Sequence, residues 1–123
     1  GYNGSPRGTK NCHDLGHCPR QKANIPAGER YELCRSVHAE QNAIIHASRQ
    51  DMLGAKMFLS GINIDDNTPV PCRPCKMCTR VIINAGIKEV ITQDNEGKII
   101  RYNVDDWVNN EITDFNEENI KGY

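Results

Sequence analysis

The sequence predicts a single α/β domain in which helices cover a mostly parallel sheet. Two observations predict this class. The chain has 123 residues, which is enough for one hydrophobic core and too few for two. Patterns typical of helix, strand, helix and strand also follow one another from the middle of the chain onward. Because strands separated by a helix usually run parallel, this order predicts crossover connections with helices packed on the sheet.

The first half of the chain predicts a loop, a helix and a strand in that order. Glycines and prolines are concentrated in residues 1–30, which predicts a loop. Residues 36–50 predict a helix, because apolar residues recur there every three or four positions and Ser36 can cap the first turn. Residues 56–64 are short and apolar between glycine and acidic residues, which predicts a buried strand followed by a loop over 63–74.

The second half predicts another helix and a pair of short strands. Residues 75–85 have apolar positions at helical spacing and stop at a glycine, which is a common helix end. Residues 88–92 and 98–102 predict two strands joined by a turn. A final helix is expected over 104–112.

The charge balance and the hydropathy narrow the range of partners. With 15 basic and 16 acidic residues the formal net charge is −1, so long nucleic acid is a poor default partner and a small molecule is favoured. No apolar run reaches the roughly 20 residues that span a bilayer, and the N-terminal residues do not form an export signal. We therefore expect a cytoplasmic protein that binds neither a membrane nor long nucleic acid.

The motif that carries the most chemistry is a set of metal ligands. Residues 38–40 read His-Ala-Glu, and residues 74–78 read Pro-Cys-Lys-Met-Cys. Cys75 and Cys78 are one helical turn apart, so both sulfurs can bind one ion, and the positive end of the helix dipole favours their thiolates. His38 supplies a third ligand if the two helix starts pack together. Three protein ligands leave a fourth position for water, which is typical of a catalytic zinc.

Glu40 is expected to move protons rather than to bind the metal. Residues two apart in a regular helix point to different sides, so His38 and Glu40 converge on one site only if His38 sits at the helix start. The glutamate then accepts a proton from the water that zinc activates and delivers protons to the substrate. Each motif taken alone has a plainer reading. His-Ala-Glu can be an ordinary helix start, and the paired cysteines can be a redox pair, a structural zinc knuckle or, with the other four cysteines, disulfides.

Further residues match a known family. They are Gly-Tyr-Asn-Gly at 1–4, the segment 12–18, Arg35, Gln-Asn-Ala-Ile at 41–44 and Ile-Ile-Asn-Ala-Gly-Ile at 82–87. Together with the metal motif, they make residues 1–93 resemble the deoxycytidylate (dCMP) deaminase branch of the zinc-dependent cytidine deaminase superfamily. The resemblance implies a three-layer sandwich with a five-stranded sheet between helices. It also implies zinc-dependent hydrolysis of a cytosine nucleotide, dCMP to dUMP, with release of ammonia.

The resemblance assigns a role to each site residue. The zinc ligands are His38, Cys75 and Cys78, the proton shuttle is Glu40, and the substrate-binding residues are Asn3, Arg35 and Ala39. Arginine matches phosphate oxygens in a bidentate geometry, so Arg7, Arg20 and Arg35 are candidates for the substrate phosphate. Arg35 is the first candidate because it lies three residues before His38, and Arg7 and Arg20 follow. Some relatives hold a second, structural zinc in the loop before the first motif. The donors available for it here are Cys12, His13, His17, Cys18 and Cys34, which can equally be reduced cysteines and solvated histidines.

The sequence also departs from the family. It lacks the first helix and the strand hairpin that precede Gly-Tyr-Asn-Gly in relatives, and its segment 61–70 is longer and more polar. We expect a deaminase domain over residues 1–112, incomplete at its N-terminal side, and a polar tail over 113–123. Exposed sheet surface in such a domain predicts a homo-oligomer. Two other functions stay open: deamination of another nucleoside, base or modified nucleotide, and an inactive zinc-binding interaction module.

Overall fold

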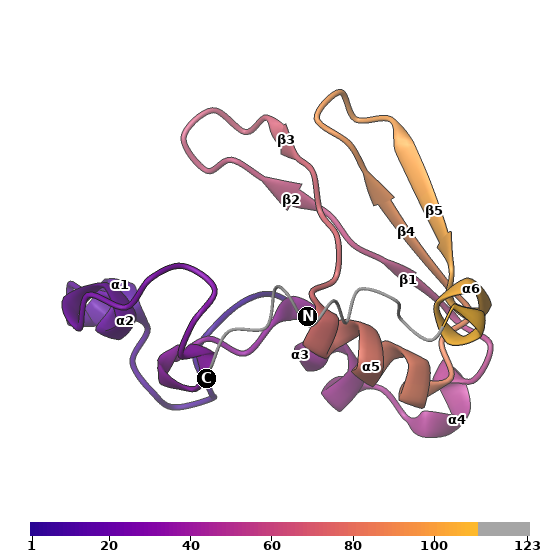
Figure 1. Ribbon diagram of the computed structural model, residues 1–123, viewed down its shortest axis with the longest axis horizontal. Coiled ribbons are helices and arrows are strands. Elements are labelled where there is room, and N and C mark those ends of the chain that lie inside the picture. Colours follow the sequence, from indigo (N-terminus) through magenta and orange to yellow (C-terminus); the bar gives the residue numbers. More distant parts are fainter. Residues whose placement is uncertain (111–123) are drawn as a thin grey trace.

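The computed structural model describes residues 1–110 and has a mixed α/β architecture, as expected (Figure 1). Its elements follow the chain in the order α1 (Cys12–Leu15), α2 (Pro19–Lys22), the 3₁₀ helix η1 (Tyr31–Leu33), α3 (Ala39–His46), α4 (Arg49–Met52), β1 (Lys56–Phe58), β2 (Gly61–Ile62), β3 (Pro69–Val70), α5 (Lys76–Ala85), β4 (Glu89–Gln93), β5 (Ile99–Asn103) and α6 (Val104–Asn109). No described helix has the length and apolar character needed to cross a membrane.

The main sheet has three strands in the order β1-β4-β5. Strands β1 and β4 are parallel, with Met57 opposite Val90, so the expected crossover through α5 is present. Strand β5 runs antiparallel to β4, with Tyr102 opposite Val90. The sheet is therefore mixed, because the short turn between β4 and β5 can only return the chain antiparallel. The described residues form three strands of this sheet, where the resemblance implies five.

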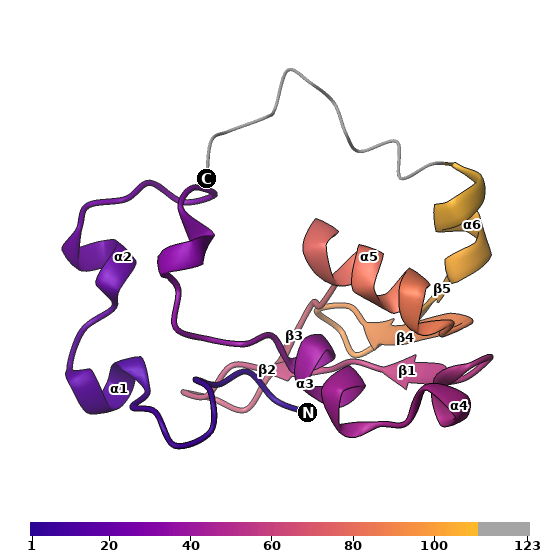
Figure 2. The same ribbon diagram turned by 90° about the horizontal axis from the view of Figure 1, so that it is seen from below.

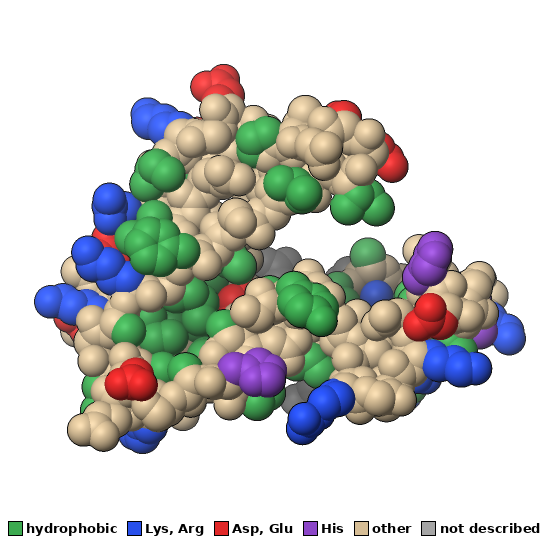
Figure 3. Space-filling view, turned by 180° about the vertical axis from the view of Figure 1, so that it is seen from behind, with side chains coloured by type: hydrophobic (Ala, Val, Ile, Leu, Met, Phe, Trp, Pro, Cys, Tyr) green, Lys and Arg blue, Asp and Glu red, His purple; other side chains and the backbone are tan. Residues whose placement is uncertain are grey.

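The hydrophobic core lies between this sheet and the helices. Val90 on β4 and Ile82 on α5 are fully buried, and residues from β1, α5, β4 and α6 complete the cluster. Helices α3 and α5 pack against each other on the same side of the sheet (Figure 2). Phe58, beside the buried Met57 on β1, is 74% exposed. In Figure 3, which views the side opposite to Figure 1, hydrophobic side chains are visible among lysine and arginine side chains.

The expected helix over 36–50 is wrong in its extent, because it is divided into α3 and α4. The side-chain oxygen of Ser48 accepts a hydrogen bond from the Asp51 N–H at 3.2 Å, which starts a second helix and ends the first. Ser36 is not the N-terminal cap. The cap residue of α3 is His38, whose backbone is extended with φ −68° and ψ 150°.

The expected strand over 56–64 is also divided. It forms β1 and the short strand β2, and β2 pairs antiparallel with β3 inside the segment expected to be a loop. The turn of this hairpin is closed locally, because the Asp66 carboxylate accepts hydrogen bonds from both the N–H and the hydroxyl of Thr68. In Figure 1 the hairpin projects away from the helices.

The ends of the chain differ from expectation in detail. The segment 1–30 contains α1 and α2, single turns that glycine and proline allow, since Gly16 ends α1 in the left-handed conformation and Pro19 begins α2. The final helix α6 ends at Asn109, before the expected end at residue 112. The expected tail 113–123 lies outside the described residues, and the division into 1–112 and 113–123 stays a prediction.

Candidate metal and catalytic site

Three metal-binding side chains meet where the starts of α3 and α5 lie side by side (Figure 1). The Nδ1 atom of His38 lies 3.5 Å from the sulfur of Cys75 and 3.2 Å from that of Cys78. All three ligand atoms lie within 4.8 Å of one another. The helix starts therefore bring together donors that are 37 and 40 positions apart in the chain.

Local hydrogen bonds hold these helix starts in place. The Gln41 side chain accepts a hydrogen bond from the His38 N–H at 3.0 Å, as the third residue of a capping box does. On α5, Cys75 is the cap residue and its sulfur accepts the Cys78 N–H at 3.5 Å. The Thr79 hydroxyl donates to the Cys75 carbonyl at 2.9 Å. Each ligand is thus tied to the backbone or side chain of a neighbour.

The geometry of the three donors fits zinc. With zinc bonds of about 2.3 Å to sulfur and 2.0–2.1 Å to nitrogen, tetrahedral coordination places nitrogen and sulfur about 3.5 Å apart. The two observed separations, 3.5 and 3.2 Å, agree with this value. One imidazole nitrogen and two sulfurs are also the donor types that zinc prefers, and three ligands leave one position free.

Glu40 lies beside this cluster and is 8% exposed. Burial raises the pKa of the Cys78 thiol, and the negative charges of Glu40 and Cys75 raise it further. The pKa of Cys72 is also raised, first by burial and then by the charge of Glu40. The Glu40 carboxylate therefore disfavours the thiolate form of both Cys72 and Cys78, and a bound cation would offset the negative charge gathered here. Because His38 is the cap residue, Glu40 and His38 can face one site, as the sequence argument requires.

The three expected substrate residues lie at or before the start of α3. The side-chain oxygen of Asn3 accepts the Ala39 N–H at 2.7 Å, so the structure brings Asn3 and Ala39 together. Arg35 is half-buried, and its Nε donates to the carbonyl of Lys10 at 3.1 Å. Their part in substrate binding stays a prediction.

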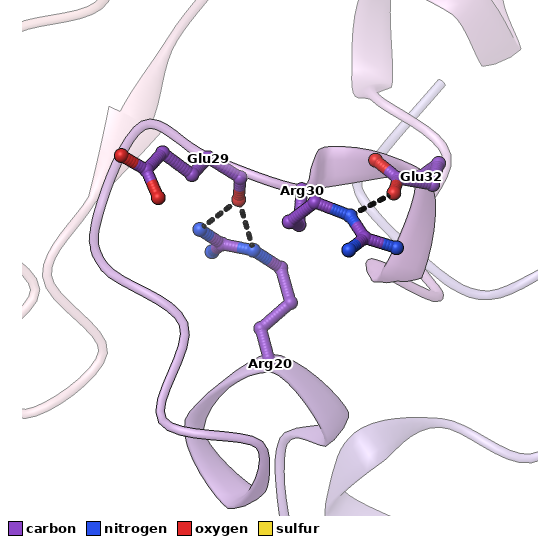
Figure 4. A network of polar contacts seen from close by, with 4 residues as sticks. All are labelled: Arg20, Glu29, Arg30 and Glu32. Atoms are coloured by element: carbon purple, nitrogen blue, oxygen red, sulfur yellow. Dashed lines mark hydrogen bonds and ion pairs between the residues drawn. The ribbon is translucent and has the colours of Figure 1, made fainter. Parts of the chain in front are cut away.

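Of the other two arginine candidates, Arg20 stabilises a loop by donating hydrogen bonds to its backbone carbonyls (Figure 4). Its guanidinium donates to the Glu29 carbonyl from Nε at 3.0 Å and from Nη2 at 2.6 Å, and to the Pro26 carbonyl at 2.9 Å. It also lies 4.3 Å from the centre of the Tyr31 ring. Arg20 thus closes the loop before η1, next to an ion pair between Arg30 and Glu32. Arg7 is exposed.

The five donors considered for a second zinc do not meet in the described part of the chain. Within residues 1–110, the only group of three or more donors close enough to share an ion is the cluster on α3 and α5. The loop donors lie on or beside α1 and α2 and after η1, and they are Cys12, His13, His17, Cys18 and Cys34. Cys18 is the N-terminal cap residue of α2, where hydrogen bonds from backbone N–H groups, first that of Gln21, lower its pKa.

Two residues for which no role was predicted organise the site. Gln41 caps the backbone of His38, and Asn42 donates a hydrogen bond to the Tyr2 carbonyl at 2.8 Å. A glutamine three positions after a cap residue is a known signal of a capping box, so the role of Gln41 is readable from the sequence once the cap is placed at His38. No local pattern indicates the bond of Asn42, because its partner lies 40 positions earlier.

The fold and the site define a zinc-binding deaminase domain. Comparison with known families agrees, since residues 1–93 match the family described as the cytidine and deoxycytidylate deaminase zinc-binding region. The chain belongs to this family, and His38, Cys75 and Cys78 form a group of donors that could hold its zinc. No solved structure gives a significant match.

Several similar curated proteins are named deoxycytidylate deaminase. The protein of Schizosaccharomyces pombe is 36% identical over 93 residues, which cover 74% of this chain and 25% of the relative. That of Mycobacterium phage D29 is 31% identical over 96 residues, covering 74% and 64%. The human protein is 37% identical over 92 residues, covering 74% and 42%. The chain thus spans between a quarter and about two thirds of the length of these relatives.

Proposed function

We propose that this chain is the catalytic region of an enzyme that hydrolyses the amino group of dCMP, forming dUMP and ammonia. The observation that carries the proposal is the buried Glu40 carboxylate beside a group of His38, Cys75 and Cys78 with zinc geometry. Relatives named deoxycytidylate deaminase, 31 to 37% identical, favour dCMP among the cytosine compounds.

The chemistry divides between the metal and Glu40. A zinc ion held by His38, Cys75 and Cys78 would lower the pKa of a bound water to about 7 and so would supply a nucleophile at neutral pH. Glu40 accepts the first proton of this water and delivers it to the ring nitrogen, and it then moves the proton of the hydroxyl added to the ring to the departing amino group. A C–O bond forms at the ring carbon, the C–N bond breaks, and ammonia leaves.

The substrate is expected to lie against the start of α3. Asn3 and Ala39 are joined by a hydrogen bond there, which supports a role for both in contacting the sugar or the base. Arg35 precedes His38 by three positions, and its Nε bond to Lys10 leaves the other guanidinium nitrogens to contact a phosphate. Arg20 is a weaker candidate, because the Glu29 and Pro26 carbonyls occupy it.

The two alternatives fit the site less well. A zinc-binding interaction module has no use for Glu40, and burying an unused carboxylate beside thiols costs free energy. Deamination of another nucleoside, base or modified nucleotide would use the same zinc and Glu40. That alternative differs only in the contacts to sugar and phosphate.

The proposed enzyme acts on a small nucleotide in the cytoplasm, without long nucleic acid or a membrane as partner, and assembles as a homo-oligomer. The net charge of −1 supports a small substrate. Exposed apolar side chains support assembly, since Phe58 and Ile99 are 74% and 58% exposed on the sheet. Light scattering at micromolar concentration tests this, and a well-behaved monomer would contradict the oligomer.

The decisive experiment follows ammonia release from a panel of cytosine and adenine bases, nucleosides and monophosphates. We expect dCMP to have the highest kcat/KM, with deoxycytidine well below it. Preference for a nucleoside or free base would move the assignment to the second enzyme class. No turnover of any panel member by the zinc-loaded protein would favour the interaction module.

A further inference from the structure

The peptide of residues 1–4 lies along the residues that begin α3 and is tied to them at several points. Gly4 and Val37 exchange two backbone hydrogen bonds, with the Gly4 N–H donating at 3.2 Å and the Val37 N–H donating at 2.7 Å. At Gly1 the peptide touches the helix backbone, because a β-carbon there would lie 2.4 Å from the Ala43 nitrogen. The peptide is thus held at both ends beside the residues that carry the site.

The Asn3 side chain has a defined direction in this arrangement. Its oxygen accepts the Ala39 N–H at 2.7 Å, and Ala39 begins α3, where the backbone N–H groups have no partner within the helix. With its oxygen used in this way, the amide presents its NH₂ group as the remaining donor. The direction of that donor depends on the position of the whole peptide.

We propose that Asn42 is a positioning residue that orients Asn3 for substrate binding by holding the Tyr2 carbonyl. The Asn42 NH₂ group donates to this carbonyl at 2.8 Å. Asn42 follows His38 by four positions and lies on α3, which His38 caps. Its hydrogen bond therefore joins the peptide of residues 1–4 to the helix whose start carries the metal donor. Tyr2 is 82% exposed, so burial of its side chain contributes little to holding the peptide in its place.

Two neighbouring residues of α3 thus have different functions. Gln41 holds the His38 backbone and so supports metal binding. Asn42 holds the peptide that contains Asn3 and so supports substrate binding. Loss of the Asn42 bond therefore weakens ground state and transition state alike, which raises KM and leaves kcat in place. The inference rests on the proposed function, since Asn3 is taken as a substrate contact.

The test compares the full-length protein with Asn42→Ala and with the matched control Asn84→Ala. Asn84 is an exposed asparagine of α5 whose side chain bonds to none of the described residues. For Asn42→Ala we expect KM for dCMP to rise about three- to tenfold, the effect of one lost hydrogen bond, with kcat and zinc content within about twofold of the parent. The control should match the parent in all three quantities.

Amide hydrogen exchange gives a second readout that needs no substrate. Exchange at the Gly4 and Val37 amides should accelerate in Asn42→Ala, because the peptide is less firmly held. If the alanine variant fails to fold, Asn42→Asp keeps the side-chain shape and loses the donor, and exchange is measured in that variant. An unchanged KM, a fall in kcat together with zinc loss, or unchanged exchange would each overturn the role of Asn42. A parent protein that does not deaminate dCMP would refute the proposed function, while exchange would still decide whether Asn42 holds the peptide.

Discussion

The side chain of Gln41 accepts a hydrogen bond from the His38 N–H at 3.0 Å, so a residue outside the candidate metal site holds the backbone of one of its three donors. Replacing Gln41 by methionine removes this acceptor at similar size. We expect zinc affinity to fall about tenfold, as for other residues that support a metal ligand, when it is measured by competition with a chelator.

Gln41→Glu is the matched control, because a carboxylate accepts the same bond. It should bind zinc within about threefold of the parent. Equal zinc affinity in the methionine variant, or equal losses in both variants, would contradict the assigned role.

Replacing Glu40 by glutamine should separate zinc binding from catalysis. The amide has nearly the shape of the carboxylate but cannot carry the proton, so kcat should fall by about 10²–10⁴ while zinc stays bound. Metal analysis and steady-state kinetics measure the two effects. Unchanged turnover in a zinc-loaded variant would rule out Glu40 as the proton shuttle.

Zinc binding should weaken as the pH falls. Burial and the charge of Glu40 raise the pKa of Cys78, so the metal-free thiol holds its proton at neutral pH and zinc must displace it. Lower pH favours the protonated thiol and therefore opposes the metal. A chelator titration between pH 6 and 8 checks this, and an apparent affinity that is constant or rises toward pH 6 would contradict it.

The phosphate contact can be tested by comparing two arginines. Arg35→Ala should lower kcat/KM for dCMP roughly tenfold or more beyond its effect on deoxycytidine, because only the nucleotide loses a charge-assisted contact. Arg20→Ala is the control for a folding defect, since Arg20 bonds to the Glu29 and Pro26 carbonyls and should affect both substrates alike. Equal losses on both substrates in Arg35→Ala would exclude it as the phosphate ligand.

Burial in the core predicts that two isoleucines contribute differently to the free energy of unfolding. Ile82 on α5 is fully buried, whereas Ile45 on α3 is 70% exposed. Ile82→Ala should lower the free energy of unfolding by about 2–5 kcal/mol, because it loses buried surface and leaves a cavity. Ile45→Ala should change it by less than about 0.5 kcal/mol. Denaturant unfolding measures both, and similar values for the two variants would contradict the observed packing.

Some errors in the expected elements come from single polar side chains. Ser48 caps α4 and so divides a pattern that reads as one helix. Asp66 closes the β2–β3 turn in a segment that reads as a loop. These short-range hydrogen bonds change the local structure that the spacing of apolar residues predicts, because that spacing carries no information about polar side-chain bonds.

The sequence by itself determined the α/β class and the family, and it predicted the three residues that form the candidate metal site. These depend on residue types at fixed short spacing, such as Cys75 and Cys78, and such spacing has the same meaning in any fold that makes the local helix. Only the tertiary structure decided which nitrogen of His38 faces the cysteine sulfurs. It also decided that the Arg20 guanidinium donates its hydrogen bonds to backbone carbonyls and that the Asn42 side chain donates to the Tyr2 carbonyl. The physical reason is that these contacts join residues brought together by packing and loop closure, and no local propensity encodes the direction in which a side chain meets a partner far away in the chain.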